Sequence, residues 1–554
     1  MKRISLVFLS TLLFVTSCVA VQKSASHKAV NDSEMFYIDT ELPEIGDFSA
    51  NLQNKRYHDE YTDEFLPSED YKTVLPFVAQ CLRYHTPESE YNGYSAGRLY
   101  NSYGFCTKDG KIVMDASGDV ENVFYYKTDD GFGYYIATIN KNDSNATKYD
   151  DVYLPSESLL IPTNGKWCLK LENGSYVQNV GYGAICVCKA KEYSTNDYLS
   201  EYELLLYDYD GKLLKNLGEK QNAEIVGENL ILINDYSSEK QKSYFCDFNG
   251  EIVYGPFSYA SGFNIYGVGC IEDLNGEHYL MNINGQRLTT QQYESVFTIY
   301  ANEGYVGFYA KHKDNSLMYD IFDSQGVYLD TVKGTSRYSN FVLTSDKKVV
   351  NTYYTDDGYE ARKADGGKIV NEEHGVSPND YCSLGDLFLY KDKNTSQAVL
   401  MDYYGNTFAE FDELEYALDM SVDKKYIVYS SGRINFDYDE QLQQNIVTNT
   451  AKLHIYDVEN QKILESFDGD GSASFFGEND RYIKIITYDS ADYLYAGDGK
   501  YSLYDTKTKR MLFFDCMYIS EVDIDGEVFL NVCTKNKCTL YNGDMKPVLT
   551  IYSE

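Results

Sequence analysis

The chain has 554 residues, a net charge of −36 at pH 7 and 43% hydrophobic residues, which is enough for a sizeable core. Such an acidic balance argues against nucleic acid as a partner and against direct binding to anionic lipid head groups. Tyrosine is unusually frequent, with 56 residues against a single tryptophan. Because tyrosine favours half-buried strands, the composition indicates an all-β protein.

The N-terminal segment has the order of a secretory signal peptide. Lys2 and Arg3 precede a short, largely apolar run over residues 4–14, and small residues lead from there to Cys18. The run is too short to span a bilayer, which takes about 20 residues. The stretch Val-Thr-Ser-Cys at residues 15–18 resembles the lipobox of bacterial lipoproteins. That resemblance implies cleavage before Cys18 and acylation of this residue, with ordinary secretion as the alternative.

These features imply domain boundaries and a location. We expect residues 1–17 to be a lipoprotein signal peptide that is removed. We expect residues 18–70 to be a polar tether, because this stretch is acidic and has little apolar periodicity. The mature protein is then expected to be extracytoplasmic, in the cell envelope, and held to a membrane by lipid on Cys18. Which membrane face or leaflet carries the anchor stays open.

From residue 71 onward one pattern recurs: a short strand, a turn rich in Asp, Asn and Gly, and a second short strand. Asp-Gly and Asn-Gly supply the positive φ that tight hairpins need. Clear copies lie at residues 104–113, 204–214, 244–253 and 279–288, and weaker ones at 321–328, 400–408, 453–464 and 503–512. Long apolar repeats at a spacing of 3.6 residues, which are typical of helices, are missing.

The spacing of the turn glycines points to one architecture. Gly211, Gly250, Gly285, Gly326, Gly367 and Gly405 are 39, 35, 41, 41 and 38 residues apart. A four-stranded blade of a β-propeller spans about 40–45 residues. We therefore predict an all-β fold, a β-propeller with seven or eight blades of antiparallel strands, in a single large domain over residues 71–554. A sandwich array or a β-solenoid is the alternative.

Several of these segments carry a family resemblance. Residues 103–113, 279–288, 292–296 and 303–307 resemble bacterial WG-repeat proteins, whose repeats combine a tyrosine-glycine, a strand, an Asp-x-x-Gly-Lys turn and another strand. The Trp-Gly pair that names those repeats is missing here. The Tyr-Asp copies at residues 456–457 and 504–505 look more like blades of the WD40 or quinoprotein type. The resemblance implies a propeller in a bacterial cell envelope and carries no catalytic residues.

The cysteines and acidic loops indicate neither a metal site nor a cofactor. Eleven cysteines remain besides Cys18, without zinc spacing. Cys533 and Cys538 flank a four-residue segment, so a hairpin could bring them opposite each other, and whether they form a disulfide is open. Residues 468–474 place oxygen ligands at alternate positions, as a calcium loop does, but Ala473 stands where glycine is needed. A solvated hairpin turn is the favoured interpretation.

No reaction can be assigned from motifs. The chain lacks Gly-x-Ser-x-Gly, His-Glu-x-x-His and Walker sequences, so we name no catalytic residue. Tyrosines cluster at Tyr353, Tyr354 and Tyr359, at Tyr493, Tyr495 and Tyr501, and at Tyr293, Tyr300, Tyr305 and Tyr309. Most of them should pack between sheets, while exposed ones could bind sugars or proteins.

We therefore expect a binding or scaffold module of the cell surface whose partner is a protein or a glycan. The alternative is an extracellular carbohydrate-active enzyme that uses carboxylates at the mouth of the propeller channel. A component of an envelope assembly complex is a third possibility. Neither the partner's identity nor the oligomeric state can be predicted from the residues.

Overall fold

A computed structural model describes the chain from residue 64 onward, with internal gaps. The described ranges are 64–83, 98–116, 120–139, 157–172, 175–190, 202–219, 222–235, 242–301, 304–315, 317–334, 340–343, 346–355, 358–363, 382–384, 387–391, 397–402, 406–432, 436–439, 444–447, 451–488, 499–534 and 537–552. Cys18, the predicted signal peptide and nearly all of the predicted tether lie outside these ranges. Within them, no helix is long and apolar enough to cross a membrane.

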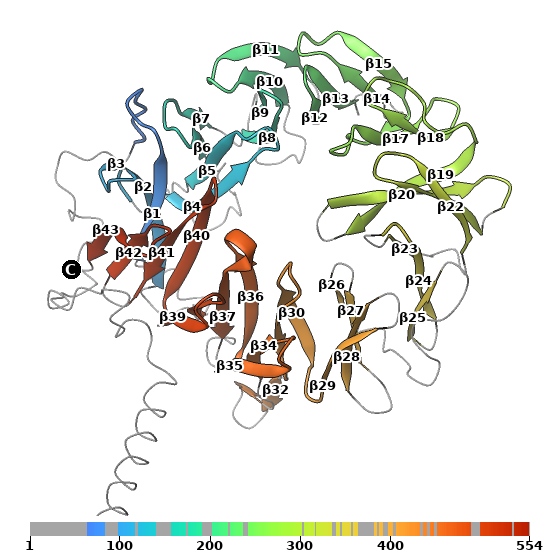
Figure 1. The fold of residues 1–554 in the computed structure, drawn as a ribbon. Coiled ribbons are helices and arrows are strands. Elements are labelled where there is room, and N and C mark those ends of the chain that lie inside the picture. The colour runs from blue at the N-terminus through green and yellow to red at the C-terminus, as the bar shows by residue number, and fades with distance from the viewer. Residues whose placement is uncertain are drawn as a thin grey trace, which may run out of the picture. The chain divides into compact units, whose positions relative to one another are not determined.

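The chain divides into two compact units, which we treat separately. Unit 1 comprises Met1–Arg56, Phe77–Leu99 and Ala417–Glu554, and unit 2 comprises Tyr57–Pro76 and Tyr100–Tyr416. Apart from one 3-10 turn, η3 (Glu478–Asp480), every regular element in the described ranges is a β-strand (Figure 1). The prediction that residues 71–554 form a single domain stays a prediction.

The first strands of the described chain form a three-stranded sheet of β1 (Val74–Arg83), β2 (Arg98–Thr107) and β3 (Ile112–Met114). Three four-stranded sheets of unit 2 follow in the chain. They are β4 (Val120–Lys127), β5 (Gly133–Ile139), β6 (Glu157–Pro162), β7 (Leu169–Leu171); β8 (Tyr176–Gly181), β9 (Ala184–Ala190), β10 (Tyr202–Asp208), β11 (Leu213–Gly218); β12 (Asn222–Gly227), β13 (Leu230–Asp235), β14 (Lys242–Cys246), β15 (Ile252–Phe257).

Further along unit 2 the sheets vary in size. The next sheet has seven strands: β16 (Tyr259–Ala260), β17 (Val268–Glu272), β18 (His278–Asn282), β19 (Tyr293–Ala301), β20 (Gly304–His312), β21 (Met318–Asp323) and β22 (Tyr328–Lys333). A three-stranded and a four-stranded sheet follow: β23 (Asn340–Leu343), β24 (Val349–Thr355), β25 (Gly358–Lys363); β26 (Cys382–Leu384), β27 (Leu387–Lys391), β28 (Ala398–Asp402), β29 (Thr407–Phe411).

The C-terminal part of the chain forms three more four-stranded sheets and one hairpin. The sheets are β30 (Tyr416–Met420), β31 (Tyr426–Ser430), β34 (Lys452–Asp457), β35 (Lys462–Asp468); β36 (Asp470–Phe476), β37 (Tyr482–Tyr488), β38 (Lys500–Asp505), β39 (Arg510–Cys516); β40 (Tyr518–Ile524), β41 (Glu527–Cys533), β42 (Lys537–Tyr541), β43 (Pro547–Tyr552). The hairpin consists of β32 (Phe436–Asp439) and β33 (Gln444–Val447), which lie between β31 and β34 in the chain.

The strands of the four-stranded sheets pair as antiparallel neighbours in chain order, so each sheet is a meander with the topology of a propeller blade. In one of them the hairpin of β32 and β33 is inserted between β31 and its partner β34. The prediction of an all-β fold of propeller-type sheets is confirmed. The predicted number of seven or eight blades is not confirmed. The described residues contain seven four-stranded sheets beside sheets of two, three and seven strands. In the seven-stranded sheet, β18 and β19 pair only at His278 and Tyr293. Counting hairpins in a sequence cannot separate such joined meanders.

One turn is repeated at the hairpins of unit 2, and it explains the Asp-x-x-Gly pattern. The Asp208 side chain accepts the backbone N–H groups of Asp210 and Lys212 at 3.1 and 2.8 Å. Gly211, third after the aspartate, has φ +75°. This is a tight turn followed by a glycine bulge, for which only glycine has an unstrained backbone. The same pattern occurs at Asp247, Asp273, Asn282 and Asp323.

A side chain of the preceding meander also packs against some of the turn glycines. The ring of Trp167, just before β7, lies over Gly211, so that a Cβ there would be 2.8 Å from Trp167 Cδ2. The indole N–H of Trp167 donates to the carbonyl of Tyr209 at 2.9 Å. Tyr254 on β15 contacts Gly285 in the same way. These contacts fix consecutive meanders to each other, and buried residues fill the space between their faces.

We predict that acid destabilises this fold through the turn carboxylates. The backbone N–H of Glu251 lowers the pKa of Asp247 below its usual value. Burial works to raise the pKa of Asp323, but hydrogen bonds from Lys347 and from the backbone outweigh it and lower that pKa. A carboxyl whose pKa is lower in the folded state stabilises above its unfolded pKa of about 3.9. This contribution is lost as the pH falls through the folded value.

The melting temperature should therefore be nearly constant from about pH 8 to pH 5 and fall below about pH 4. Circular dichroism over this range measures the effect. A midpoint that stays level or rises down to about pH 3 would contradict the prediction.

Candidate ligand pocket

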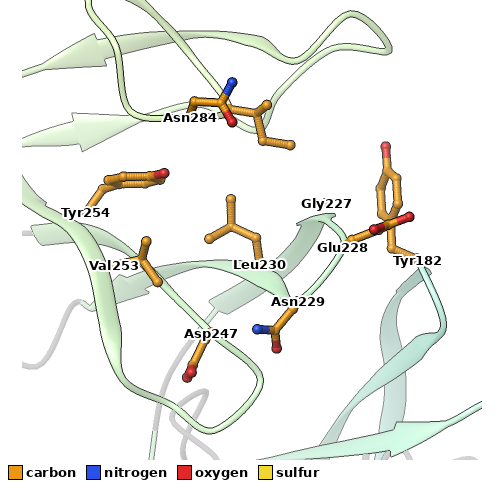
Figure 2. Close-up of a pocket in the computed structure, with 10 residues that line it drawn as sticks. Tyr182, Gly227, Glu228, Asn229, Leu230, Asp247, Val253, Tyr254 and Asn284 are labelled. Atoms are coloured by element: carbon orange, nitrogen blue, oxygen red, sulfur yellow. The ribbon is translucent and has the colours of Figure 1, made fainter.

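A pocket of about 470 Å³ opens in unit 2 where the turns of three consecutive meanders come together (Figure 2). Tyr182 comes from the turn between β8 and β9, and Glu228 and Asn229 from the turn between β12 and β13. Tyr254 lies on β15, and Asn284 belongs to the turn after β18. The full lining is Tyr182, Gly227, Glu228, Asn229, Leu230, Asp247, Val253, Tyr254, Ile283 and Asn284.

Tyr182 is held in a backbone conformation that a bulky side chain rarely adopts. It forms a two-residue turn with Gly183, and both residues have positive φ, +49° and +80°. Such turns favour Asn, Asp or Gly at the first position. Asp130 stabilises the turn, because its Oδ2 accepts the N–H of Gly183 at 3.0 Å, and Tyr209 donates its hydroxyl to Asp130 at 2.8 Å. An aromatic ring retained in a strained turn suggests a functional role.

Apolar atoms form the floor of the pocket, and tyrosine rings stand at its sides. Leu230 lies in the middle, with Tyr254 on one side and Tyr182 on the other (Figure 2). The Tyr182 side chain is 37% exposed, and burial together with Asp129 and Asp130 raises the pKa of its phenol. Tyr254 is half-buried against Gly285. Both hydroxyls lack a hydrogen-bond partner among the described residues and are available to a ligand.

The polar groups of the lining fall into two sets. Asp247 Oδ1 is occupied by the N–H groups of its own turn, and Asn229 Oδ1 accepts the N–H of Phe248 at 3.0 Å. Figure 2 shows both side chains directed away from Asn284. The Glu228 carboxylate and the Asn284 side-chain amide, by contrast, bond to no residue in the described ranges. The pocket therefore offers a carboxylate and an amide beside two phenols.

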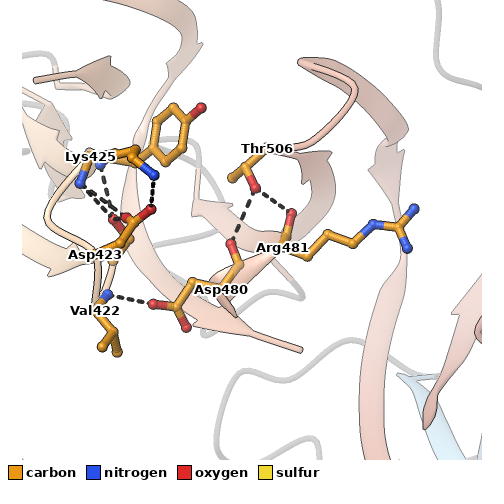
Figure 3. Close-up of polar contacts among 8 residues, drawn as sticks. Val422, Asp423, Lys425, Asp480, Arg481 and Thr506 are labelled. Atoms are coloured by element: carbon orange, nitrogen blue, oxygen red, sulfur yellow. Dashed lines mark hydrogen bonds and ion pairs between the residues drawn. The ribbon is translucent and has the colours of Figure 1, made fainter. Parts of the chain in front are cut away.

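A second polar cluster, in unit 1, is structural. The Asp480 carboxylate accepts the N–H of Val422, and the Thr506 hydroxyl donates to the carbonyl of Arg481 at 2.9 Å (Figure 3). Lys425 pairs with Asp423 at 2.7 Å. These bonds join the turn before β31 to η3 and to the turn after β38. The groups bond to one another, so the cluster fixes neighbouring sheets of unit 1.

Of the tyrosines singled out in the sequence, Tyr293, Tyr309 and Tyr501 have described side chains, and none of the three lines the pocket. Tyr293 is 3% exposed and donates its hydroxyl to Asp320 at 2.8 Å, and Tyr309 and Tyr501 pack against core clusters. Tyr353, Tyr354 and Tyr359 belong to β24 and β25, and Tyr300 and Tyr305 to β19 and β20. Tyr493 and Tyr495 lie outside the described ranges. The Tyr-Gly pair at residues 182–183, between two apolar runs, is the signal that could have identified Tyr182.

Two smaller expectations have different outcomes. Cys533 and Cys538 are direct cross-strand partners in β41 and β42, so the predicted hairpin is confirmed. The structure contains both as free thiols.

Residues 470–476 form strand β36, so the interpretation of this acidic segment as a hairpin turn is wrong. Gly469, at φ +116°, lets the chain pass from β35 into the next sheet. No group of three potential metal ligands occurs among the described residues.

No family model matches the chain, and no curated protein matches it. Solved structures with some similarity include a eukaryotic initiation factor, with 8% identity, TM-score 0.39, and coverage of 78% of this chain and 93% of that one. BamB from Moraxella catarrhalis has 11% identity, TM-score 0.25, and coverage of 49% and 87%. The Dos1 propeller has 11% identity, TM-score 0.25, and coverage of 53% and 82%.

Likenesses this weak carry no argument about activity or partners. The class of the protein rests on its own sheets: it is an all-β protein built from consecutive antiparallel meanders of the propeller type. The WG-repeat resemblance and the lipid anchor stay predictions.

Proposed function

We propose that the protein is a lipid-anchored, extracytoplasmic binding module that holds a glycan in the pocket of unit 2. The observation that supports this most is the combination in one pocket of two tyrosine rings with a carboxylate and an amide that have no partner among the described residues. A sugar ring has an apolar face of C–H groups, which suits an aromatic side chain, and an equator of hydroxyls, which needs hydrogen-bonding groups. Small-molecule sites have this composition: apolar walls with a few well-placed polar groups.

The size of the pocket favours a glycan over a protein partner. Its volume of about 470 Å³ lies within the roughly 300–1,000 Å³ that is usual for small-molecule sites. A stable protein interface buries about 800 Å² on each partner. Ten lining residues around a concave site fit one or two sugar rings better than a protein surface.

Asp247, one of the two lining carboxylates, favours binding over hydrolysis. A glycosidase needs one carboxyl group that stays protonated to act as an acid, with a raised pKa. The pKa of Asp247 is lowered instead, first by the backbone N–H of Glu251. Burial raises the pKa of Glu224, but this residue is not part of the lining. The carbohydrate-active enzyme therefore has no specific observation in its favour.

Tyr182→Asn is the sharpest test of the binding proposal. Asparagine tolerates positive φ, so the variant should fold at least as stably as the original protein, while losing the aromatic wall. We expect the affinity for the bound glycan to fall at least about tenfold, which corresponds to about 1.4 kcal/mol. A glycan array identifies the ligand, with sugar release read from the same wells, and calorimetry then compares the variants.

Tyr266→Asn is the matched control, because Tyr266 is 52% exposed in another turn of unit 2 and does not line the pocket. If Tyr182→Asn and Tyr266→Asn bound the glycan with equal affinity, the pocket would not be the glycan site. Release of sugar would establish an enzyme instead, and failure to bind any saccharide would overturn the glycan function.

The anchor has its own test. Cys18→Ala should move most of the protein from the membrane fraction to the soluble fraction, since each buried methylene of an acyl chain contributes about 0.8 kcal/mol to membrane binding. Fractionation followed by immunoblotting measures the distribution. Unchanged partitioning would contradict the lipoprotein assignment without affecting the pocket.

A further inference from the structure

We infer that the pocket takes a sugar that carries a free amine and rejects sugars that carry an acid group; this inference rests on the proposed glycan function. Its basis is the charge of the site. Two of the ten lining residues, Glu228 and Asp247, are acidic, and none is Lys, Arg or His. The field extends beyond the lining, because Asp129 and Asp130 act on the Tyr182 phenol from the neighbouring turn.

Glu228 is the group that would recognise the amine. Its carboxylate bonds to none of the described residues, whereas Asp247 is committed to its own turn. An ammonium group bound to Glu228 forms a charge-assisted hydrogen bond, which is roughly twice as strong as a neutral one. The ring of Tyr182, which lies beside Glu228 in Figure 2, adds the attraction between a cation and an aromatic face. An acidic sugar in the same place would meet like charge with no cation to offset it.

Three oligosaccharide probes separate the possibilities: β-1,4-linked glucosamine, its N-acetylated form, and an oligogalacturonate. We expect the glucosamine oligomer to bind at least tenfold tighter than the N-acetylated one, with an affinity that falls as salt rises. The galacturonate should not bind. Glu228→Gln should abolish the preference for the free amine, because glutamine keeps a hydrogen-bonding oxygen but carries no charge. Glu251→Gln, an exposed carboxylate outside the lining, is the matched control.

The outcomes distinguish the two levels of the proposal. Equal binding of the amine and its N-acetylated form, unchanged by Glu228→Gln, would overturn the inference and leave the glycan function standing. Tighter binding of the galacturonate would also overturn it. No binding of any saccharide, on the full array as well as with these probes, would overturn both.

A separate observation in unit 1 carries a second inference. Cys533 on β41 and Cys538 on β42 are directly opposite in the antiparallel pair, so their Cβ atoms lie on the same side of the sheet. They are 0% and 5% exposed, so both thiols are buried in the last sheet. We propose that Cys533 and Cys538 are joined by a disulfide in the mature protein. Each thiol loses a hydrogen, and the disulfide of an oxidising thiol-exchange partner is reduced to two thiols.

The order of events follows from burial. Thiol exchange requires a thiolate, and burial raises the pKa of Cys533 far above its usual value. The bond should therefore form during folding, before the last sheet closes over the cysteines. Cys186 and Cys188 are a matched control pair, because they are equally buried but lie two residues apart on one strand and do not face each other.

Refolding the protein with oxidised glutathione and mapping peptides without reduction tests this. The peptide containing residues 533–538 should be about 2 Da lighter than its reduced form, with Cys186 and Cys188 still open to alkylation. Cys533→Ser should leave Cys538 open to alkylation after denaturation, and Cys516→Ala should leave the bond intact. Full alkylation of both Cys533 and Cys538 in the refolded, denatured protein would overturn the proposal.

Discussion

Replacing Gly211 with alanine should lower the free energy of unfolding of unit 2 by about 2–4 kcal/mol. Gly211 has φ +75°, a conformation that costs an L-residue about 1–2 kcal/mol. The added Cβ would also lie 2.8 Å from Trp167 Cδ2, so the indole would have to move. That movement would disturb the hydrogen bond from the indole to Tyr209 and the contact between the two meanders.

Gly276→Ala separates the two causes. Gly276 occupies the same position in its turn, with φ +77°, but a Cβ there would meet nothing within 4 Å. Its replacement should cost about 1–2 kcal/mol, from backbone strain alone. Urea unfolding followed by circular dichroism measures both variants. Equal losses in the two variants would show that the contact with Trp167 contributes nothing to stability.

Replacing Asp457 with alanine should destabilise unit 1 by about 2–4 kcal/mol. The side chain is 3% exposed and accepts hydrogen bonds from the backbone and the side chain of Asn460. Lys509, from the turn of the next sheet, reaches it at 3.2 Å. Without the carboxylate, buried donors lose their acceptor, and the ionic contact between two successive sheets is lost.

Asp544→Ala is the comparison, because Asp544 also pairs with a lysine, Lys546, at 3.5 Å, but both side chains are about three-quarters exposed. A surface pair of this kind contributes little, so the change should stay within about 0.5 kcal/mol. Denaturant unfolding of the two variants gives the difference. If Asp457→Ala lowered the free energy of unfolding no more than Asp544→Ala does, the ion pair between the two sheets would not contribute to stability.

The hairpins of this fold are predictable because their cause is local. An Asp or Asn followed three residues later by Gly, as at Asp208 and Gly211, determines a turn through hydrogen bonds and a positive φ within five residues. How the hairpins group into sheets depends on packing between segments that are distant in the chain. The single pairing of His278 with Tyr293, which joins β18 to β19, leaves no mark in either strand's sequence.

The pocket was not predictable for the same reason. Its residues come from turns around positions 182, 228 and 284, about 50 residues apart in the chain, and only the stacking of three meanders brings them together. Tyrosines that are close together in the sequence, such as Tyr353 and Tyr354, lie in strands instead. Strand residues alternate between faces, and inward ones such as Tyr293 become core, whereas Tyr182 stays exposed because a turn carries it.

Trp167 gives this protein a built-in optical probe. It is the only tryptophan among 554 residues, so indole emission comes from a single site in unit 2, and unit 1 contributes none. The ring packs against the turn of the following meander, and its N–H donates a hydrogen bond to the carbonyl of Tyr209. Light of a wavelength that tryptophan absorbs and tyrosine does not would excite Trp167 alone among the 56 tyrosines. A change in its fluorescence would therefore report the loss of the contact between Trp167 and the turn of the following meander.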